Sequence, residues 1–360
     1  SGIVHIMIPA LYDEMLDGSE DTLGDKVQVF VDAQRLAYAD RDHYVADPDF
    51  VEVPTELLVD PAYIRHRAAQ RFAPAETPTH GDPYFDAPAA WLPGVDATIE
   101  GVGTTHLSII DAVSMTASVG FPYGSIRMTN GFFLNNEMTD FSDDVGAGGA
   151  PAANAIAPGK RSRSSMSPTI IFDENGDPAM LTGSAGGSSI LAYTTKTILA
   201  LYDWELSAQE AVDFPNIVAR GEQVGVEVSA SGGQALADDL AARGYNVQVG
   251  RGENSGLHII FVTDEGLTGA AARAAILLAA TLFSTSLLAQ EIDAANARLI
   301  AERPSVNGES TVVAVGVFII DIDEIDDVRQ RYNADLFMNI AWQDPRLALP
   351  EQERSSQVRT

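Results

Sequence analysis

The order of apolar and polar residues divides the chain into a helical first part and a mixed second part. Apolar side chains recur at helical spacing within residues 1–24, 26–44 and 61–72, which predicts three helices. The second helix should end before Asp47-Pro48, because proline disfavours helix in the residue that precedes it. Prolines and glycines interrupt the segment 73–98, which we expect to be a loop or a mobile processing segment.

Strand patterns begin near Thr104. Alternation over 105–111 and 112–119 predicts a hairpin, and a further pair of strands flanks the Asn-Gly turn within 173–177. Strands mixed with helices predict an α+β layer architecture. The strands that flank the Asn-Gly turn are expected at 167–172 and 178–182. The other expected elements are strands at 247–249 and 257–262 and helices at 189–203, 207–213 and 233–243.

The residues after 270 form a different pattern. Arg273 leads into 274–289, which are sixteen residues without a charge. A helix that spans a bilayer needs about 20 residues, so we expect no membrane span here. The segment is similar either to the apolar core of a secretory signal peptide or to a buried terminal helix. Beyond it, alternation over 311–321 predicts a strand.

The composition excludes several classes of partner. The chain has 51 Asp and Glu against 22 Lys and Arg, a formal net charge of −29, whereas binding to a phosphate backbone needs clustered cations. We therefore expect no nucleic-acid partner, and the acidity favours solubility or adaptation to salt. There is no cysteine and the six histidines lack metal-ligand spacing, so we expect no metal and no other cofactor. Residues 1–5 lack the charged start of a signal peptide.

The candidate chemistry centres on Gly103 and Thr104. A threonine hydroxyl needs a base, and an N-terminal threonine carries one in its own α-amine, whose unperturbed pKa is about 7.7–8.0. Cleavage of the Gly103–Thr104 bond would free that amine, and the unhindered Gly103 carbonyl suits attack by the Thr104 hydroxyl. Taken alone, Gly-Thr-Thr is equally typical of an ordinary strand start.

Further motifs follow Thr104-Thr105-His106 in a fixed order. They are LNNEMTDFS at 134–142, PGKR at 158–161, SSMSPT at 164–169 and GSAGGS at 183–188. Together they resemble the small subunit of the gamma-glutamyltranspeptidase family of N-terminal nucleophile hydrolases, and 37–42 and 47–50 resemble the end of that family's large subunit. The resemblance spans about residues 1–270 and implies partial αββα layers.

The resemblance implies four catalytic positions. Thr104 would be the nucleophile and the new N-terminus after autocleavage between Gly103 and Thr104. Gly186 and Gly187 would donate backbone N–H groups to the oxyanion, where donors aimed at developing charge matter most. Ser118 lies near the family's second threonine, which hydrogen-bonds the nucleophile. Without the family context, the glycine loop would equally fit a phosphate nest or a helix entry.

The resemblance also implies four substrate-binding positions. Ser164 and Ser165 would hold the substrate α-carboxylate through hydroxyl and backbone donors. Glu137 and Asp140 would accept hydrogen bonds from its α-ammonium group. Alone, the serine pair could cap a turn before Pro168, and the acidic pair could be solvated surface.

Several positions depart from the family pattern. Gly120 lies where the family tends to carry a polar or acidic substrate contact, and Ala185 replaces a frequent proline. We expect His106 to be a packed or hydrogen-bonded strand residue rather than a ligand or base. The family's large subunit also supplies an N-terminal half with an arginine for the substrate carboxylate. We expect such a segment to be a partner of this chain.

Residues 304–349 resemble a second family. VGVFI at 315–319 and AWQDPRL at 341–347 are similar to the first two strands of the extracellular domain of pentameric ligand-gated ion channels. An acidic β-hairpin of no special ancestry is the alternative. Neither a ligand pocket nor a pore can be built from these strands alone.

Two functional hypotheses follow. The first is a gamma-glutamyl amidohydrolase or transpeptidase that acts through a Thr104 acyl-enzyme on substrates such as glutathione; a cephalosporin-acylase-like amidase is the alternative within this class. The second is an inactive composite fragment or a binding module with a channel-like tail. The resemblance implies a periplasmic or secreted protein. We expect a large-subunit-like region at 1–103, a catalytic region at 104–270, an apolar helix and linker at 271–303 and a β-rich region at 304–360.

Overall fold

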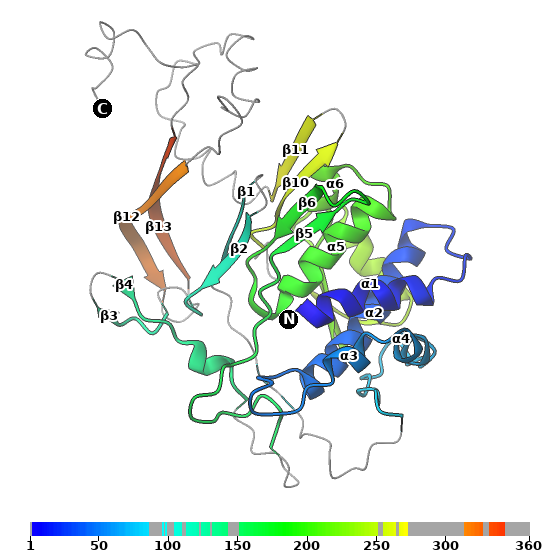
Figure 1. Cartoon of the computed structure of the whole chain (residues 1–360). Helices are drawn as coiled ribbons and strands as arrows, with labels where there is room; N and C mark the ends of the chain where they lie inside the picture. The colour runs from blue at the N-terminus through cyan, green and yellow to red at the C-terminus, as the bar shows by residue number, and fades with distance from the viewer. Residues whose placement is uncertain are drawn as a thin grey trace, which may run out of the picture. The chain divides into compact units, whose positions relative to one another are not determined.

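The computed structural model of the chain has two compact units, residues 1–284 and 285–360, each of which is described by itself. The structure describes residues 2–85, 96, 98, 104–109, 113–121, 124–129, 132–142, 151–250, 255–263, 266–272, 313–326 and 331–342. Figure 1 shows the helices and strands of both units along the chain.

The first part of the chain is helical, as expected. Helices α1 (Gly2–Met15) and α2 (Leu23–Tyr44) confirm the helices predicted in 1–24 and 26–44. A capping box starts α2: Thr22 Oγ1 accepts from the Asp25 N–H at 3.2 Å, and the Asp25 carboxylate accepts from the Thr22 N–H at 3.0 Å. After the short α3 (Thr55–Leu58), α4 (Pro61–Ala68) ends four residues before the predicted boundary.

Helix α1 joins the first part of the chain to the second. It packs on α2, α4 and α5 (Ile190–Tyr202). The Tyr12 hydroxyl donates to Asp203 at 2.5 Å and accepts from the Trp204 indole N–H at 3.1 Å. The rings of Phe30 and Trp204 pack edge to face, with their centroids 5.7 Å apart. The larger apolar core therefore contains residues from both sides of Thr104.

The second part of the chain is built on a four-stranded antiparallel sheet and a separate hairpin. The sheet consists, from one edge to the other, of β11 (Gly266–Ala271), β10 (His258–Thr263), β6 (Pro178–Gly183) and β5 (Thr169–Phe172). The hairpin consists of β1 (Thr104–Ile109) and β2 (Val113–Ser118), and it contacts β6. These elements confirm the predicted hairpin at 105–119 and the strand pair around the Asn-Gly turn.

Helices cover one face of the sheet and the hairpin covers the other. Met180 of β6 packs in a core that it shares with α5 and α6 (Ala208–Asp213). Its neighbour Leu181 faces the opposite way by strand alternation and is also fully buried. A Cβ on Gly183, on the same face as Leu181, would lie 2.2 Å from the His106 ring of β1. Helix, sheet and hairpin therefore form successive layers, which confirms the α+β class and corresponds to part of an αββα arrangement (Figure 1).

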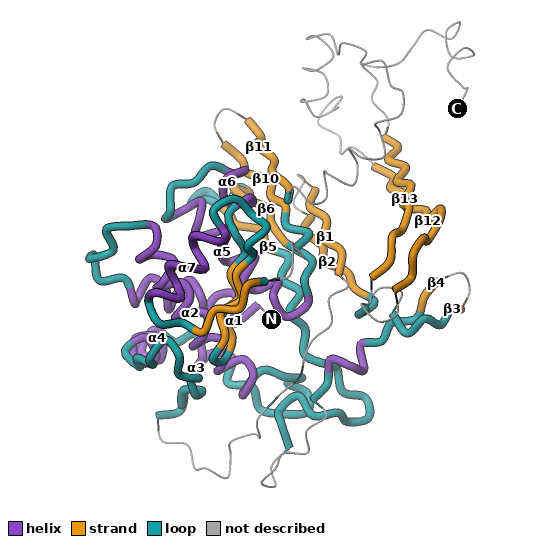
Figure 2. The backbone as a smooth tube through the Cα atoms, turned by 180° about the vertical axis from the view of Figure 1, so that it is seen from behind, coloured by secondary structure: helices purple, strands orange, loops and turns teal. Residues whose placement is uncertain are grey.

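A smaller sheet contains two strands that the sequence does not predict. β7 (Ile217–Arg220) and β8 (Gln223–Val226) form a hairpin, and β9 (Asn246–Val249) pairs in parallel with β8 after α7 (Gly233–Ala242). The two missed strands, β7 and β8, have only four residues each, which gives little room for a visible alternation. Helices α5, α6 and α7 and strand β9 confirm the other expectations here. Helix α7 contacts α2, and Figure 2 shows the two helices beside each other.

Two strands form the described part of the second unit. β12 (Val313–Asp326) and β13 (Arg331–Trp342) pair as an antiparallel hairpin in which Val313 is opposite Trp342. The strand expected at 311–321 is therefore confirmed, and it is longer than predicted. The apolar helix expected at 274–289 lies outside the described residues, and the resemblance to ion channels stays a prediction. Among the helices that the structure describes, none is long and apolar enough to cross a membrane.

Candidate active site

The β1–β2 hairpin places Thr104 directly opposite Ser118. The strand register pairs Thr104 with Ser118 and Leu107 with Met115. Alternation turns Thr104, His106 and Ser118 toward the face that meets β6, and it leaves Leu107 and Met115 exposed on the other face. Opposite residues of antiparallel strands have Cβ atoms about 4.5–5.5 Å apart, so the Ser118 side chain is a direct neighbour of Thr104.

Thr104 lies in a cleft of about 310 Å³ to which distant parts of the chain contribute. Seven of the eight candidate catalytic and substrate-binding residues line this cleft, and Gly186 directly precedes one of them. Gly103 lies outside the described residues. The structure thus brings the candidates together, while their individual roles stay predictions. The lining residues are Thr104, Ser118, Gly120, Glu137, Asp140, Ser164, Ser165, Met166, Gly187 and Ile190.

The glycine pair stands between β6 and the start of α5. Gly186 has φ of 134° and Gly187 has φ of 57°, values that side chains with a Cβ rarely adopt. The short 3-10 turn η3 (Gly187–Ser189) follows and leads into α5, whose first residue Ile190 also lines the cleft. The Tyr38 hydroxyl donates to the Ser188 carbonyl at 2.7 Å and supports this turn from α2. The positive end of α5 therefore lies at the cleft, where negative charge is stabilised.

The acidic pair is held on a second 3-10 turn, η2 (Glu137–Asp140), after the short hairpin of β3 (Met128–Thr129) and β4 (Phe132–Phe133). Both acids are half-buried. The Asn154 side chain donates to the Asp140 carbonyl at 2.7 Å, and the Asn136 side chain accepts from the Phe121 N–H at 2.7 Å. These two hydrogen bonds connect the turn to the loops on both sides, so the turn that carries the two carboxylates is held in place.

Gly120 departs from the family pattern, and the structure explains why this position is a glycine. Its φ is 86°, and a Cβ at this position would lie 2.0 Å from Asn136 Oδ1. Its N–H donates to Ser118 Oγ at 2.9 Å. The position therefore requires glycine, because a side chain would displace the amide that fastens the acidic turn.

The serine pair lies between the cleft and a buried arginine. Ser164 Oγ accepts from the Met166 N–H at 3.2 Å. Ser165 is buried, and its Oγ accepts from Arg41 Nη2 of α2 at 2.5 Å. The segment is anchored one residue earlier, where the Arg163 N–H donates to Asn154 Oδ1 at 3.0 Å.

A charged network lies behind the serine pair. Asp42 contacts three guanidinium groups: Arg41 at 3.0 Å, Arg220 at 2.6 Å and Arg163 at 3.5 Å. Arg163 also pairs at 2.9 Å with Asp96, which belongs to the segment that leads to Thr104. Arg41 and Arg163 are buried, and buried charges need such partners because desolvation of an unpaired ion is costly.

His106 is a buried strand residue, as the sequence predicts. Its ring nitrogens lie 2.7 Å from Thr116 Oγ1 and 3.0 Å from Ser108 Oγ. Burial, with a smaller contribution from His258, lowers the pKa of His106 to about 4. The ring is therefore neutral at pH 7 and fills the space that Gly183 leaves open under β1.

We expect the protein to lose stability as the pH falls from 7 to 5. Burial lowers the pKa of His43 and His106 to about 4, whereas histidine in an unfolded chain titrates near 6.5. Below pH 6.5 the unfolded chain takes up protons that the fold excludes, so each residue should remove about 2 kcal/mol by pH 5. Urea unfolding at several pH values measures this loss. His106→Gln should flatten the profile; equal free energies of unfolding at pH 7 and 5 would contradict it.

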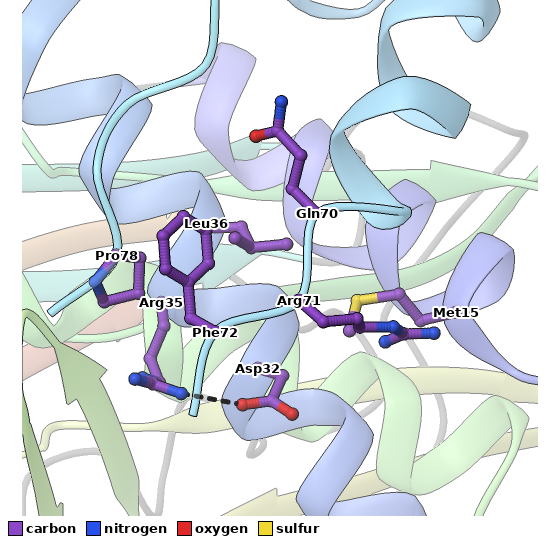
Figure 3. A pocket seen from close by; sticks show the side chains of 8 residues that line it. All are labelled: Met15, Asp32, Arg35, Leu36, Gln70, Arg71, Phe72 and Pro78. Atoms are coloured by element: carbon purple, nitrogen blue, oxygen red, sulfur yellow. Dashed lines mark hydrogen bonds and ion pairs between the residues drawn. The ribbon is translucent and has the colours of Figure 1, made fainter. Parts of the chain in front are cut away.

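A second cavity, of about 230 Å³, lies among α1, α2 and the residues after α4 (Figure 3). Asp32 and Arg35 form an ion pair there at 3.0 Å, and Arg35 also donates to the Ala73 carbonyl. Figure 3 shows Arg71 beside Met15 at the same cavity. The Asp32 and Arg35 charges offset each other, and the candidate catalytic residues lie elsewhere. Within the described part of the chain, no group of three His, Asp or Glu is placed to hold a metal ion.

The sequence analysis did not predict a role for some residues that line the cleft, nor for the arginines that contact the serine pair and its neighbours. Met166 directly follows the serine pair and Ile190 opens a predicted helix, so their neighbours point to them. Arg41 lies within the 37–42 motif, but that motif gave it no role, and Arg163 lies between two motifs. The contacts of both residues depend on burial and on distant segments.

Comparisons with known proteins agree with this arrangement. The glutathione hydrolase proenzyme of Escherichia coli K12 is 35% identical over 230 residues, which are 60% of this chain and 38% of that protein. The acylase ACY 1 proenzyme of Pseudomonas sp. strain V22 is 32% identical over 257 residues, 69% of this chain and 42% of that protein. The chain thus spans about two fifths of the length of these relatives.

A solved structure supports the fold. The cephalosporin acylase from Bacillus halodurans has a TM-score of 0.60 at 24% identity, over 75% of this chain and 47% of that chain. The family model described as Gamma-glutamyltranspeptidase matches residues 1–275, which is most of the chain. The chain therefore belongs to the gamma-glutamyltranspeptidase family.

Proposed function

We propose that this chain is the catalytic part of an N-terminal nucleophile amidohydrolase that acts on gamma-glutamyl compounds through Thr104. The observation that carries the proposal is the cleft at Thr104, where a hydroxyl, a glycine pair, two serines and two carboxylates converge from separate segments. Family membership over 1–275 supports the same chemistry.

Activation begins with cleavage before Thr104. The Thr104 hydroxyl adds to the Gly103 carbonyl carbon, the C–N bond breaks, and an ester links Gly103 to Thr104 Oγ while the nitrogen becomes a free amine. Water then hydrolyses the ester and leaves a carboxylate on Gly103 and a hydroxyl on Thr104. The new amine is the base that the hydroxyl needs.

Catalysis repeats this chemistry on the substrate. The Thr104 amine takes the hydroxyl proton as Oγ attacks the gamma-carbonyl carbon, and the backbone N–H groups of Gly186 and Gly187 receive the developing oxyanion. The leaving amine accepts the proton, and an acyl ester on Thr104 remains. Attack by water gives hydrolysis, and attack by an acceptor amine gives transfer. Ser118, opposite Thr104, orients the nucleophile.

Substrate choice follows from the two polar groups of the cleft. Ser164 and Ser165 suit a carboxylate, which needs donors, and Glu137 and Asp140 suit an ammonium group, which needs acceptors. A gamma-glutamyl group carries both charges on one carbon, as in glutathione. A cephalosporin-acylase-like amidase is the second candidate, supported by the acylase relatives.

Two measurements on the purified chain test the proposal. Intact-mass analysis should find two fragments, the second beginning at Thr104, and a gamma-glutamyl anilide should release its aniline. We expect preference for this compound over the glutaryl anilide, which lacks the ammonium group that Glu137 and Asp140 would bind. A chain that stays uncut and releases no aniline after long incubation would contradict the proposal.

The remaining regions have separate proposed roles. We assign 1–103 to the end of a large subunit, 104–270 to the catalytic region, 271–303 to an apolar helix and linker and 304–360 to a β-rich region. The β12–β13 hairpin supports the last assignment, and a channel-like binding module is the alternative role of the tail. Removal of 271–360 should then abolish binding or assembly and spare cleavage at Thr104. A large-subunit segment is the proposed protein partner.

A further inference from the structure

We propose that Asp96 is a positioning residue for the cleavage before Thr104, because it fastens the chain that leads to Thr104 to the segment that carries the serine pair. This inference rests on the proposed function, since it concerns the cleavage step that activates Thr104. Asp96 lies eight positions before Thr104, so it acts through the chain between them and not at the bond itself. Asp96 and Thr98 are the described residues of this stretch, which we call the leading segment.

Both oxygens of the Asp96 carboxylate are used, and they bind different parts of the chain. Oδ1 accepts hydrogen bonds from the Thr98 N–H at 2.8 Å and from the Thr98 hydroxyl. An aspartate that accepts from the N–H two residues on fixes the local direction of the chain. Oδ2 forms an ion pair at 2.9 Å with Nη1 of Arg163, and both side chains of this pair are fully buried. One carboxylate therefore shapes the leading segment and binds it to a residue 67 positions later.

The leading segment is held from a second direction as well. Arg220 of β7 donates from Nη2 to the Thr98 carbonyl at 3.4 Å. The same guanidinium group donates from Nε to Asp42 of α2 at 2.6 Å, and Asp42 also lies 3.5 Å from Arg163. One carboxylate of α2 thus contacts both arginines that hold the leading segment.

The residue that binds Asp96 is directly connected to the cleft. Arg163 immediately precedes the serine pair, which lines the cleft together with Thr104. The Arg163 N–H donates to Asn154 Oδ1 at 3.0 Å, and Nδ2 of the same asparagine donates to the Asp140 carbonyl of η2 at 2.7 Å. The leading segment is therefore fastened to the same contacts that hold the serine pair and the acidic turn at the cleft.

The direction of the leading segment matters because the attacked carbonyl has little freedom of its own. The Gly103 carbonyl carbon is bonded to the Thr104 nitrogen, so it turns about the N–Cα bond of Thr104 as the preceding chain changes direction. In the cleavage step, Oγ of Thr104 bonds to that carbon, the C–N bond breaks, and the hydroxyl proton ends on the released nitrogen. Attack requires the oxygen and the carbon to approach to about 3–3.5 Å, and a misplacement of about 1 Å can lower the rate about 10²-fold.

The anchor is close enough along the chain to control that direction. Thr98 lies six positions before Thr104, and six residues span at most about 20 Å when fully extended. The pairing of β1 with β2 holds the other end, since Thr104 is fixed opposite Ser118. With both ends held, the chain that arrives at the Gly103–Thr104 bond has a restricted set of paths.

The test separates the rate of cleavage from the rate of hydrolysis. The full chain is made by cell-free synthesis with a short pulse of label, and its conversion into two fragments is followed on a denaturing gel. In Asp96→Asn we expect cleavage to slow by about tenfold or more. Arg163 keeps its contact with Asp42 in this variant, so its buried charge keeps a counter-charge. Once the variant is cut, its kcat/KM for the gamma-glutamyl anilide should stay within about twofold of wild type, because Asp96 does not line the cleft.

Further variants separate positioning from general support. Asp96→Glu keeps the carboxylate and should restore part of the cleavage rate. Thr98→Val removes the hydroxyl that donates to Asp96, and it should add little to the effect of Asp96→Asn, because both changes break the same contact. Asp25→Asn is the matched control: it weakens the capping box of α2 and the ion pair with Arg243, so it should lower the melting temperature without slowing cleavage.

The outcomes distinguish this inference from the proposed function. If the wild-type chain is cut, an unchanged cleavage rate in Asp96→Asn, or an equal fall of cleavage rate and kcat/KM, would overturn the inference alone. A wild-type chain that stays uncut contradicts the proposed function, and hydrogen exchange of the Thr98 amide then decides whether Asp96 is an anchor. That exchange should be at least about tenfold faster in Asp96→Asn, and equal exchange would overturn the inference. If Asp96→Asn does not fold, the cleavage rate of Thr98→Val decides, and a rate equal to wild type would overturn it.

Discussion

Thr104→Ala should leave the chain uncut and lower hydrolysis of a gamma-glutamyl anilide by at least about 10³-fold. The substitution removes the hydroxyl that attacks the Gly103 carbonyl, so the α-amine is never released and the base is lost with the nucleophile. The position tolerates alanine structurally, because Thr104 is the half-buried first residue of β1. Intact-mass analysis and release of the aniline measure both effects.

Two variants serve as controls for this result. Thr104→Ser keeps a hydroxyl at the same position and should still be cleaved, although more slowly. Thr105→Ala changes the adjacent residue, whose side chain is exposed on the outer face of the hairpin, and should leave cleavage intact. Cleavage of Thr104→Ala at the same bond would show that another residue is the nucleophile.

Arg67→Met should lower the free energy of unfolding by about 3–5 kcal/mol. Asp40 and Arg67 are both fully buried and form an ion pair at 3.0 Å, and Asp40 also accepts from the Tyr63 hydroxyl and the Gly81 N–H at 2.8 Å each. Burial already raises the pKa of Asp40. Without Arg67, the carboxylate loses its counter-charge and must either stay charged at high cost or take up a proton. Urea unfolding at pH 7 measures the loss.

The same substitution at the surface should have far less effect. Arg161→Met removes ion pairs of 2.6 Å with Asp47 and Asp49, but the Arg161 side chain is 67% exposed. Asp47 also keeps its hydrogen bonds from the Arg161 and Asp49 backbone N–H groups at 2.8 and 3.2 Å. Arg67 also donates to the Thr79 carbonyl at 2.6 Å, so its loss should loosen the loop after α4 as well. Similar losses in both variants would argue against burial as the source of the difference.

Local patterns were sufficient for most of the fold. Apolar spacing predicts α1 and α2, and the capping residues Thr22 and Asp25 lie within four positions of each other, so the information is local. The Asn-Gly turn likewise predicts the β5–β6 pair. β7, β8 and β11 were missed although each pairs with a strand that is adjacent in the sequence, because four to six residues give only a short alternation of apolar and polar side chains.

The candidate site was also predictable only in part from the sequence. The order of the motifs indicates Thr104, the serine pair and the glycine pair through family resemblance, before any geometry is known. That seven of the eight candidate catalytic and substrate-binding residues line one cleft is a property of the folded chain. The requirement for glycine at position 120 also appears only in space, where Asn136 occupies the place of a Cβ.

The sequence by itself therefore determined most of the helices, the first hairpin and the absence of cysteine chemistry, and it predicted a latent nucleophile at Thr104. These properties depend on residue type and short-range spacing. Only the tertiary structure decided that Arg41 donates a hydrogen bond to Ser165, which lies 124 positions later in the chain. The same holds for the ion pairs of Asp42 with three arginines. The physical reason is burial: contacts between charged groups far apart in the chain leave no periodic pattern, and their strength depends on water being excluded around them.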